Sequence, residues 1–172
     1  YGCDVLALQE CEGGEALSEL GDKFEFVGSA EATETRGFVH LYVRRGVAFH
    51  AVTLGASSPS VAVRVRLAEA SDDAELLVAA VHLPSGDSSG KRTAIMTQLM
   101  HDLGDDDNVC IVGDMNIKDD ELSELRKDLR LREAGYSGFS FGAPGNRLDH
   151  RLPKRSFGQR YDRVLFAQNV WA

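Results

Sequence analysis

Residues that could carry out acid–base chemistry follow a short apolar stretch in the second half of the chain. Residues 109–112 are apolar, and Gly113 separates them from Asp114 and Asn116. Side chains at positions i and i+2 of an extended strand face the same way, so a carboxylate and a carboxamide would lie together at the strand end. Such a pair could hold a water beside a phosphoryl oxygen. An ordinary Gly-Asp turn has the same residues, so the prediction depends on further polar groups nearby.

Three further polar residues lie at or near the ends of other apolar segments. They are Glu10, His82 and Asp162. Strand ends at one edge of a packed sheet converge, and converging carboxylates suit Mg²⁺, which keeps several of its waters. A hard cation beside a water held by aspartate and an imidazole could attack a phosphodiester. A half-buried histidine or a turn aspartate would be unremarkable alone, so the set as a whole carries the prediction.

Alternation of apolar and polar residues predicts the elements that would position these groups. Strands are expected over 4–9, 24–27, 37–44, 47–54, 60–67, 75–83, 109–112 and 161–166. Such half-buried strands with short connections are typical of largely antiparallel sheets. Apolar residues at helical spacing predict helices over 15–20, 88–103 and 119–132. Residues 135–160 are expected to form a loop.

Composition limits the class of protein. The 172 residues are 43% hydrophobic and 27% charged, which fits one globular domain over 1–172. A formal net charge of −8 excludes a wholly basic surface but allows a local basic groove for nucleic acid. Three cysteines without a C-x-x-C pair argue against a disulfide framework and favour a reducing compartment, nuclear or cytoplasmic. No apolar run has membrane length. A monomer is expected.

A competing motif is the sequence Gly86-Asp87-Ser88-Ser89-Gly90, which matches the nucleophile elbow of serine hydrolases. Ser88, Asp114 and His150 could then be drawn as a catalytic triad. In that fold the elbow follows its strand directly, within an alternating strand and helix pattern. The sequence here has neither feature, which disfavours the triad.

Four segments together resemble the endonuclease/exonuclease/phosphatase superfamily of Mg²⁺-dependent phosphoesterases. They are DVLALQE (4–10), VHLPSG (81–86), IVGDMN (111–116) and YDRVLF (161–166). The helix after the second segment, the GDMNIKDDE run, the FSFG motif and the basic loop resemble the 5′-tyrosyl-DNA phosphodiesterases most. The resemblance implies an α/β (α+β) fold: a two-sheet β-sandwich flanked by helices, four-layer and DNase I-like, with the site at one edge.

The resemblance also implies roles for the polar residues. Glu10 would bind Mg²⁺, or Mn²⁺ in its place, and Asp114 would orient and deprotonate the attacking water. Asn116 would contact the phosphate, and His82 would hydrogen-bond a phosphate oxygen or the transition state. Asp162 matches a carboxylate that orients a catalytic histidine.

Substrate contacts are expected from Ser85, Arg92, Lys118, Phe141 and Arg160. Phe141 could stack on a base, and the basic stretch could follow a single-stranded DNA backbone. This stretch contains Arg147, Arg151, Lys154, Arg155, Arg160 and Arg163.

Two parts of the superfamily pattern are not found in the chain. These are a strand bearing an asparagine before DVLALQE and a strand bearing an Asp-His pair after YDRVLF. The chain is therefore expected to be a single domain lacking both strands. The expected activity is removal of tyrosyl adducts from DNA 5′ ends, a DNA-repair reaction. The alternatives are another phosphoesterase of the superfamily, such as an exonuclease, a deadenylase or a lipid or inositol-phosphate phosphatase, and a degenerate binding module.

Overall fold

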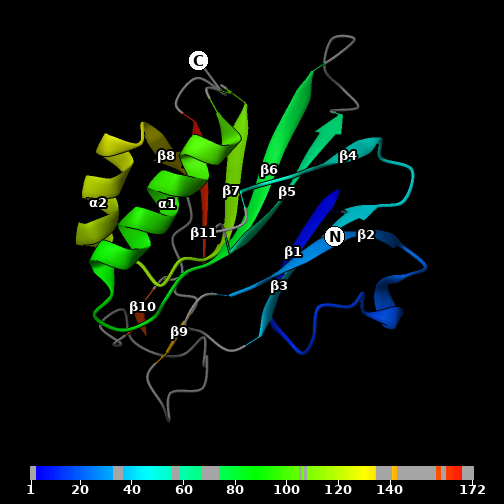
Figure 1. Cartoon of the computed structure of the whole chain (residues 1–172), viewed down its shortest axis with the longest axis horizontal. Coiled ribbons are helices and arrows are strands. Elements are labelled where there is room, and N and C mark those ends of the chain that lie inside the picture. The colour runs from blue at the N-terminus through cyan, green and yellow to red at the C-terminus, as the bar shows by residue number, and fades with distance from the viewer. Residues whose placement is uncertain are drawn as a thin grey trace.

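Two β-sheets stacked face to face, with helices on one outer side, make up the fold in a computed structural model (Figure 1). The structure describes residues 3–32, 37–55, 59–66, 74–104, 106, 108–134, 141–142, 158–159 and 162–167. This arrangement confirms the predicted α+β sandwich. Within these ranges, no helix is long and apolar enough to cross a membrane.

The larger sheet has six strands and carries most of the predicted site. Its order is β4 (Phe49–Val52), β5 (Ser60–Arg66), β6 (Glu75–His82), β7 (Val109–Asp114), β11 (Asp162–Ala167) and β8 (Leu131–Glu133). Neighbouring strands are antiparallel except β6 and β7, which are parallel. The helix α1 (Ser89–Leu103) connects these two strands, so both end at the same edge of the sheet.

The smaller sheet has three antiparallel strands, in the order β1 (Val5–Cys11), β3 (Phe38–Arg44) and β2 (Phe24–Glu31). Alternate residues of β3 are apolar and fully buried against the larger sheet. This core contains Val39, Leu41, Val43, Val63, Val65, Val78, Ala80 and Cys110. A separate pair of short strands consists of β9 (Phe141–Gly142) and β10 (Gly158–Gln159).

The helices α1 and α2 (Asp119–Asp128) cover the other face of the larger sheet (Figure 1). Their apolar faces bury Met96, Leu99, Leu122 and Leu125. These side chains share a core with Leu77, Ile111, Met115, Ile117 and Leu165. The two apolar faces of β6 and β7 explain why their sequences read as nearly continuous hydrophobic runs.

The predicted helix over 119–132 was too long. It ends at Asp128, and Arg130 follows with a left-handed φ of 53°. Leu131 then pairs with Ala167 as part of β8, where it is buried. Burial of one leucine in the sheet thus overrides the helical propensity of the charged residues before it.

The helix expected over 15–20 is also shorter than predicted. Only a 3₁₀ turn, η1 (Ser18–Leu20), forms there. The backbone N–H of Leu17 donates to the Tyr42 hydroxyl at 2.9 Å, which fixes the start of the turn on β3. With glycines at positions 13, 14 and 21, the segment is too short to nucleate an α-helix.

Candidate active site

Three of the predicted polar residues lie side by side at one edge of the larger sheet. In the parallel pair of β6 and β7, His82 is in register with Asp114. In the antiparallel pair of β7 and β11, Asp162 is in register with the same aspartate. Asp114 is therefore flanked by an imidazole on one neighbouring strand and a carboxylate on the other.

Gly113 lets β7 approach β6 closely just before Asp114. Its φ is +142°, and a Cβ built on it would lie 2.0 Å from the Val81 carbonyl oxygen. No side chain fits at that distance, so only glycine can occupy this position. The close approach fixes where the end of β7 delivers the catalytic candidate Asp114.

Asp114 and Asn116 are neighbours for a different reason from the one expected. The strand ends at Asp114, and Asn116 has a left-handed φ of 49°. Its backbone N–H donates to Asp114 Oδ1 at 3.0 Å, as in an Asx turn. The Asn116 side-chain amide donates to the Leu83 carbonyl at 2.9 Å. A turn, and not two positions of one extended strand, thus joins the carboxylate to the carboxamide.

The surroundings of Asp114 raise the pKa of its carboxyl group. Burial is the main cause, and the negative charges of Asp162 and Glu10 act in the same direction. The N–H of Asn116 and a charged His82 oppose the increase. His82 is 2% exposed, and its Nε2 lies 3.8 Å from Asp114 Oδ2. A carboxylate with a raised pKa is a stronger base, which suits it to removing a proton from water.

Glu10 approaches this edge from the smaller sheet through a β-bulge. The register of β1 on β3 shifts between Leu8 and Cys11, and Glu10 has a φ of 57°. Gly37 packs against the bulge, where an added Cβ would lie 2.8 Å from the Cys11 carbonyl oxygen. Bulges reorient side chains, and this one leaves Glu10 exposed while its charge still acts on Asp114.

The loop after Glu10 is anchored to β3. His40 is fully buried, and its Nε2 lies 2.8 Å from the Gly13 carbonyl oxygen. Its Nδ1 lies 3.1 Å from the Tyr42 hydroxyl. Ser29 on β2 donates to the Gly14 carbonyl at 2.7 Å. These contacts hold the chain that leaves the bulge.

Metal binding at this edge would involve few protein ligands. Among the residues that the structure describes, no group of three or more His, Cys, Asp or Glu side chains could hold a metal ion. Mg²⁺ is usually bound through one or two carboxylates, with water and substrate oxygens completing its coordination. The exposed carboxylate of Glu10 fits that kind of site, and an enclosed cage of protein ligands is not available in the described part of the chain.

Several solved structures share this architecture. TDP2 from D. rerio, complexed with a single-stranded DNA product, aligns with a TM-score of 0.59 at 12% identity, covering 94% of this chain and 70% of that one. The human nocturnin catalytic domain with bound sulfate aligns at 0.57 and 14%, covering 96% and 69%. An endonuclease/exonuclease/phosphatase family protein from Leptotrichia buccalis aligns at 0.59 and 12%, covering 94% and 75%.

The chain has the endonuclease/exonuclease/phosphatase fold. No protein-family model and no curated protein sequence matches it. The likeness is therefore one of three-dimensional structure.

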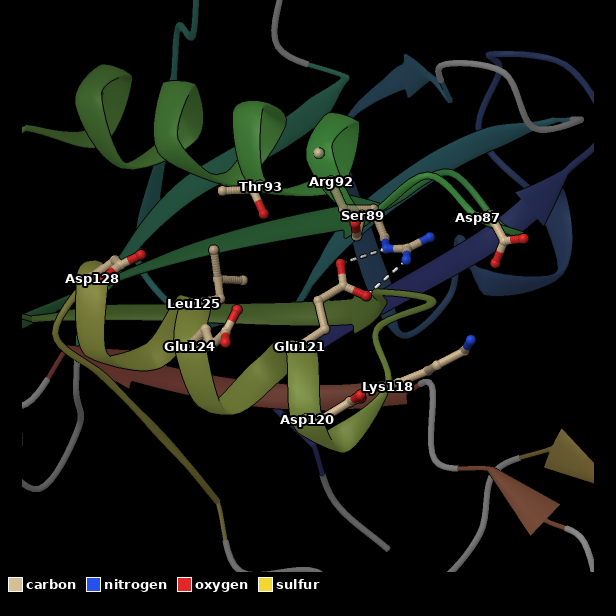
Figure 2. Close-up of a pocket in the computed structure, with 11 residues that line it drawn as sticks. Asp87, Ser89, Arg92, Thr93, Lys118, Asp120, Glu121, Glu124, Leu125 and Asp128 are labelled. Carbon is tan, nitrogen blue, oxygen red and sulfur yellow. Dashed lines mark hydrogen bonds and ion pairs between the residues drawn. The ribbon is translucent and has the colours of Figure 1, made fainter.

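Two predicted substrate contacts lie on loops at the edge of the larger sheet that also carries His82 and Asp114. Ser85 follows β6, Lys118 follows β7, and both are exposed. Lys118 also lines a groove of about 540 Å³ between α1 and α2 (Figure 2). Phe141 is placed in β9, opposite Gln159, but its side chain and all of Arg160 lie outside the described residues.

Arg92 and Arg163 have a different environment from the one expected of substrate ligands. Arg163 is 4% exposed, and its guanidinium donates to Glu133 Oε1 at 2.8 Å and Asp119 Oδ1 at 2.7 Å. It also donates to the Ile117 carbonyl. Arg92 is 2% exposed and bonded to Glu121. Buried guanidinium groups require such partners, so neither arginine forms part of a basic surface.

The alternation of residues along β11 indicates the buried position of Arg163. Arg163 and Leu165 are two positions apart in a strand, so they point to the same face, and that face is buried. The other basic residues of the predicted stretch, from Arg147 to Arg160, lie outside the described residues.

The competing triad gains no support from the fold. Ser88 is the residue before α1 and does not directly follow β6. His150 lies outside the described residues.

Proposed function

We propose that this protein is a Mg²⁺-dependent phosphodiester hydrolase that acts on nucleic acid and removes tyrosyl adducts from DNA 5′ ends. The observation that carries the proposal is the placement of Asp114, with its raised pKa, between His82 and Asp162 at the ends of β6, β7 and β11. This edge belongs to a fold shared with D. rerio TDP2, whose structure is a complex with a single-stranded DNA product. Removal of tyrosyl adducts from DNA would give the protein a role in DNA repair.

Asp114 is the general base in this proposal. Its carboxylate accepts a proton from water as the water oxygen attacks the phosphorus. The bond between phosphorus and the tyrosyl oxygen breaks, leaving a DNA 5′-phosphate and a tyrosine oxygen that takes up a proton from solvent. Asn116 is held by its bonds to Asp114 and Leu83, so the carboxamide needs no reorganisation during the reaction. In this proposal His82 would donate a hydrogen bond to a phosphate oxygen.

Glu10 would hold the cation on the side of the site formed by β1. When bound there, Mg²⁺ supplies positive charge that neutralises the developing negative charge on the phosphoryl group. Asp162 adds negative charge beside Asp114, which favours proton uptake by the base.

The test is hydrolysis of a 5′-tyrosyl oligonucleotide and of the same oligonucleotide without the adduct, each with Mg²⁺ and with EDTA. We expect release of tyrosine from the first, dependence on Mg²⁺, and slower cleavage of the second. If protein of confirmed fold cleaves neither substrate at saturating Mg²⁺, the hydrolase proposal is wrong.

Binding of short single-stranded DNA across a salt series separates nucleic acid from other phosphate esters. Affinity that depends on phosphate contacts falls steeply with salt, because counterions are released on binding. An affinity that is flat with salt would contradict a nucleic-acid substrate. Tight binding without any cleavage would instead indicate a binding module.

A further inference from the structure

One buried guanidinium links the loop after β6 to the first turn of α2, two segments that follow the proposed catalytic residues in the chain. Arg92, in the first turn of α1, is 2% exposed. Its Nη1 donates to the carbonyl oxygens of Pro84 and Gly86, both at 2.9 Å. Its Nε and Nη2 donate to Glu121 Oε1 and Oε2 at 2.9 and 2.7 Å. Figure 2 shows this paired contact between the two helices.

The bonded partners of Arg92 belong to segments that leave the site. Pro84 and Gly86 lie in the loop that follows His82, and Glu121 lies in the first turn of α2, after Asn116. Closer to the site, the same two segments meet where the Leu83 N–H donates to the Asp114 carbonyl at 2.9 Å. The bonds of Leu83 and Asn116 therefore link the two segments next to the site, and the bonds of Arg92 link them again farther from it.

A guanidinium is suited to this task because its donors are arranged in a rigid plane. One edge matches the carboxylate of Glu121, and the remaining terminal nitrogen reaches two carbonyls at once. An ammonium group cannot reproduce that geometry. The side chain of Glu121 is 14% exposed, so the pair is also shielded from solvent and from screening by salt.

We infer that Arg92 is a positioning residue, which sets the spacing between His82 and the Asp114–Asn116 turn through its bonds to the loop after β6 and to the first turn of α2. The inference rests on the proposed function for its catalytic consequence. Without Arg92, the catalytic side chains would all remain, but the loop after β6 and the start of α2 would lose their fixed relative position. Small displacements of catalytic groups lower the rate of the chemical step more than they lower binding.

The principal test is a paired substitution, Arg92→Met with Glu121→Leu, which removes the brace without leaving a buried charge. A partly buried ion pair elsewhere provides the control. Arg64 on β5 pairs with Asp106 at 2.5 Å, with side chains 30% and 18% exposed, before the start of β7. The control variant is Arg64→Met with Asp106→Leu. For each protein we would measure the thermal midpoint, kcat, KM and amide hydrogen exchange.

For the Arg92 pair we expect a fall in kcat of about tenfold or more with KM within about twofold. Amide exchange should become faster in residues 83–88 and 115–118, while the amides of β6 and β7 keep their protection. The control pair should change neither kcat nor exchange in these loops. A kcat within about twofold of the wild type, or unchanged exchange in both loops, would overturn the inference.

One further variant keeps the test decisive. Arg92→Lys keeps the charge beside Glu121 but not the planar set of donors, and we expect it to lower kcat while the protein remains folded. If the paired variant does not fold, a wild-type kcat in Arg92→Lys would overturn the inference. If the wild-type protein cleaves neither substrate, the proposed function fails by itself, and hydrogen exchange alone decides whether Arg92 fixes the loops.

Discussion

The two sides of the site are built in opposite ways. On the larger sheet, His82 is buried, and Asp114 and Asn116 are half-buried and joined by hydrogen bonds to each other and to Leu83. On the smaller sheet, Glu10 is exposed at a bulge, where its backbone packs against Gly37. The first side has a fixed geometry, and the second presents a charge to solvent.

This difference matches the two tasks in the proposed reaction. A general base and its partners act only if they are already aligned with the water and the phosphorus, which favours buried, hydrogen-bonded groups. A ligand for Mg²⁺ shares its cation with water and substrate oxygens, so it can remain exposed and adjustable. Substitutions that disturb the packing or the hydrogen bonds of the first side should therefore affect folding and catalysis together, and those on the second side should affect mainly the requirement for metal.

The largest effect is expected from Gly113→Ala, on the fixed side. The new Cβ would meet the Val81 carbonyl oxygen at 2.0 Å, and the backbone φ of +142° is unfavourable for alanine. We expect a loss of about 3 kcal/mol or more in the free energy of unfolding, measured by urea denaturation. Gly90→Ala in α1 is the control, because nothing lies within 4 Å of its added Cβ.

Alanine at position 90 should leave the stability unchanged or raise it by up to about 1 kcal/mol, since alanine favours helix. Equal stabilities of the two variants would contradict the close contact between β6 and β7.

A smaller effect is expected from Glu10→Gln, on the exposed side. Loss of the charge should raise the Mg²⁺ concentration needed for half-maximal activity about tenfold, with the free energy of unfolding nearly unchanged. Glu12→Gln is the matched control, because Glu12 is also exposed and lies on the loop just beyond the bulge. A Mg²⁺ titration that is the same for both variants and the wild type would show that Glu10 does not hold the cation.

The sequence predicted the strands and their polar ends because hydrophobic alternation is a local property. It placed Glu10, His82, Asp114 and Asp162 at strand ends, and the structure brings the last three into register. The sandwich follows from the same pattern, since strands with buried faces need a second layer.

The details that align the site depend on contacts between distant residues, so the pattern could not reveal them. The bulge at Glu10 packs against the distant Gly37, and the side chain of Asn116 bonds to the distant Leu83. Arg92 was predicted to contact substrate, because its sequence surroundings do not show that Glu121 of α2 lies beside it in the fold. Charge alone does not distinguish a substrate ligand from one half of a buried pair.

The most direct test of the account is the pH dependence of kcat/KM for the wild type and for Asp114→Asn, on the 5′-tyrosyl oligonucleotide. The acid limb of this profile reports the pKa of the base in the free enzyme. Because the pKa of Asp114 is raised above the ordinary value of 3.8, wild-type activity should fall at a higher pH than an ordinary aspartate would give. The variant should be about 10²- to 10⁴-fold slower and lack this limb.

The same shift fixes the sign of a stability change that controls for misfolding. A carboxyl group whose pKa is higher in the folded state contributes stability below its unfolded pKa and loses it as pH rises through the folded value. At pH 7 the folded wild type must bury the charged form of Asp114, whereas asparagine is neutral. Asp114→Asn should therefore be at least as stable as the wild type at pH 7. A folded variant that keeps wild-type kcat/KM and its acid limb would contradict the assignment of Asp114 as the base.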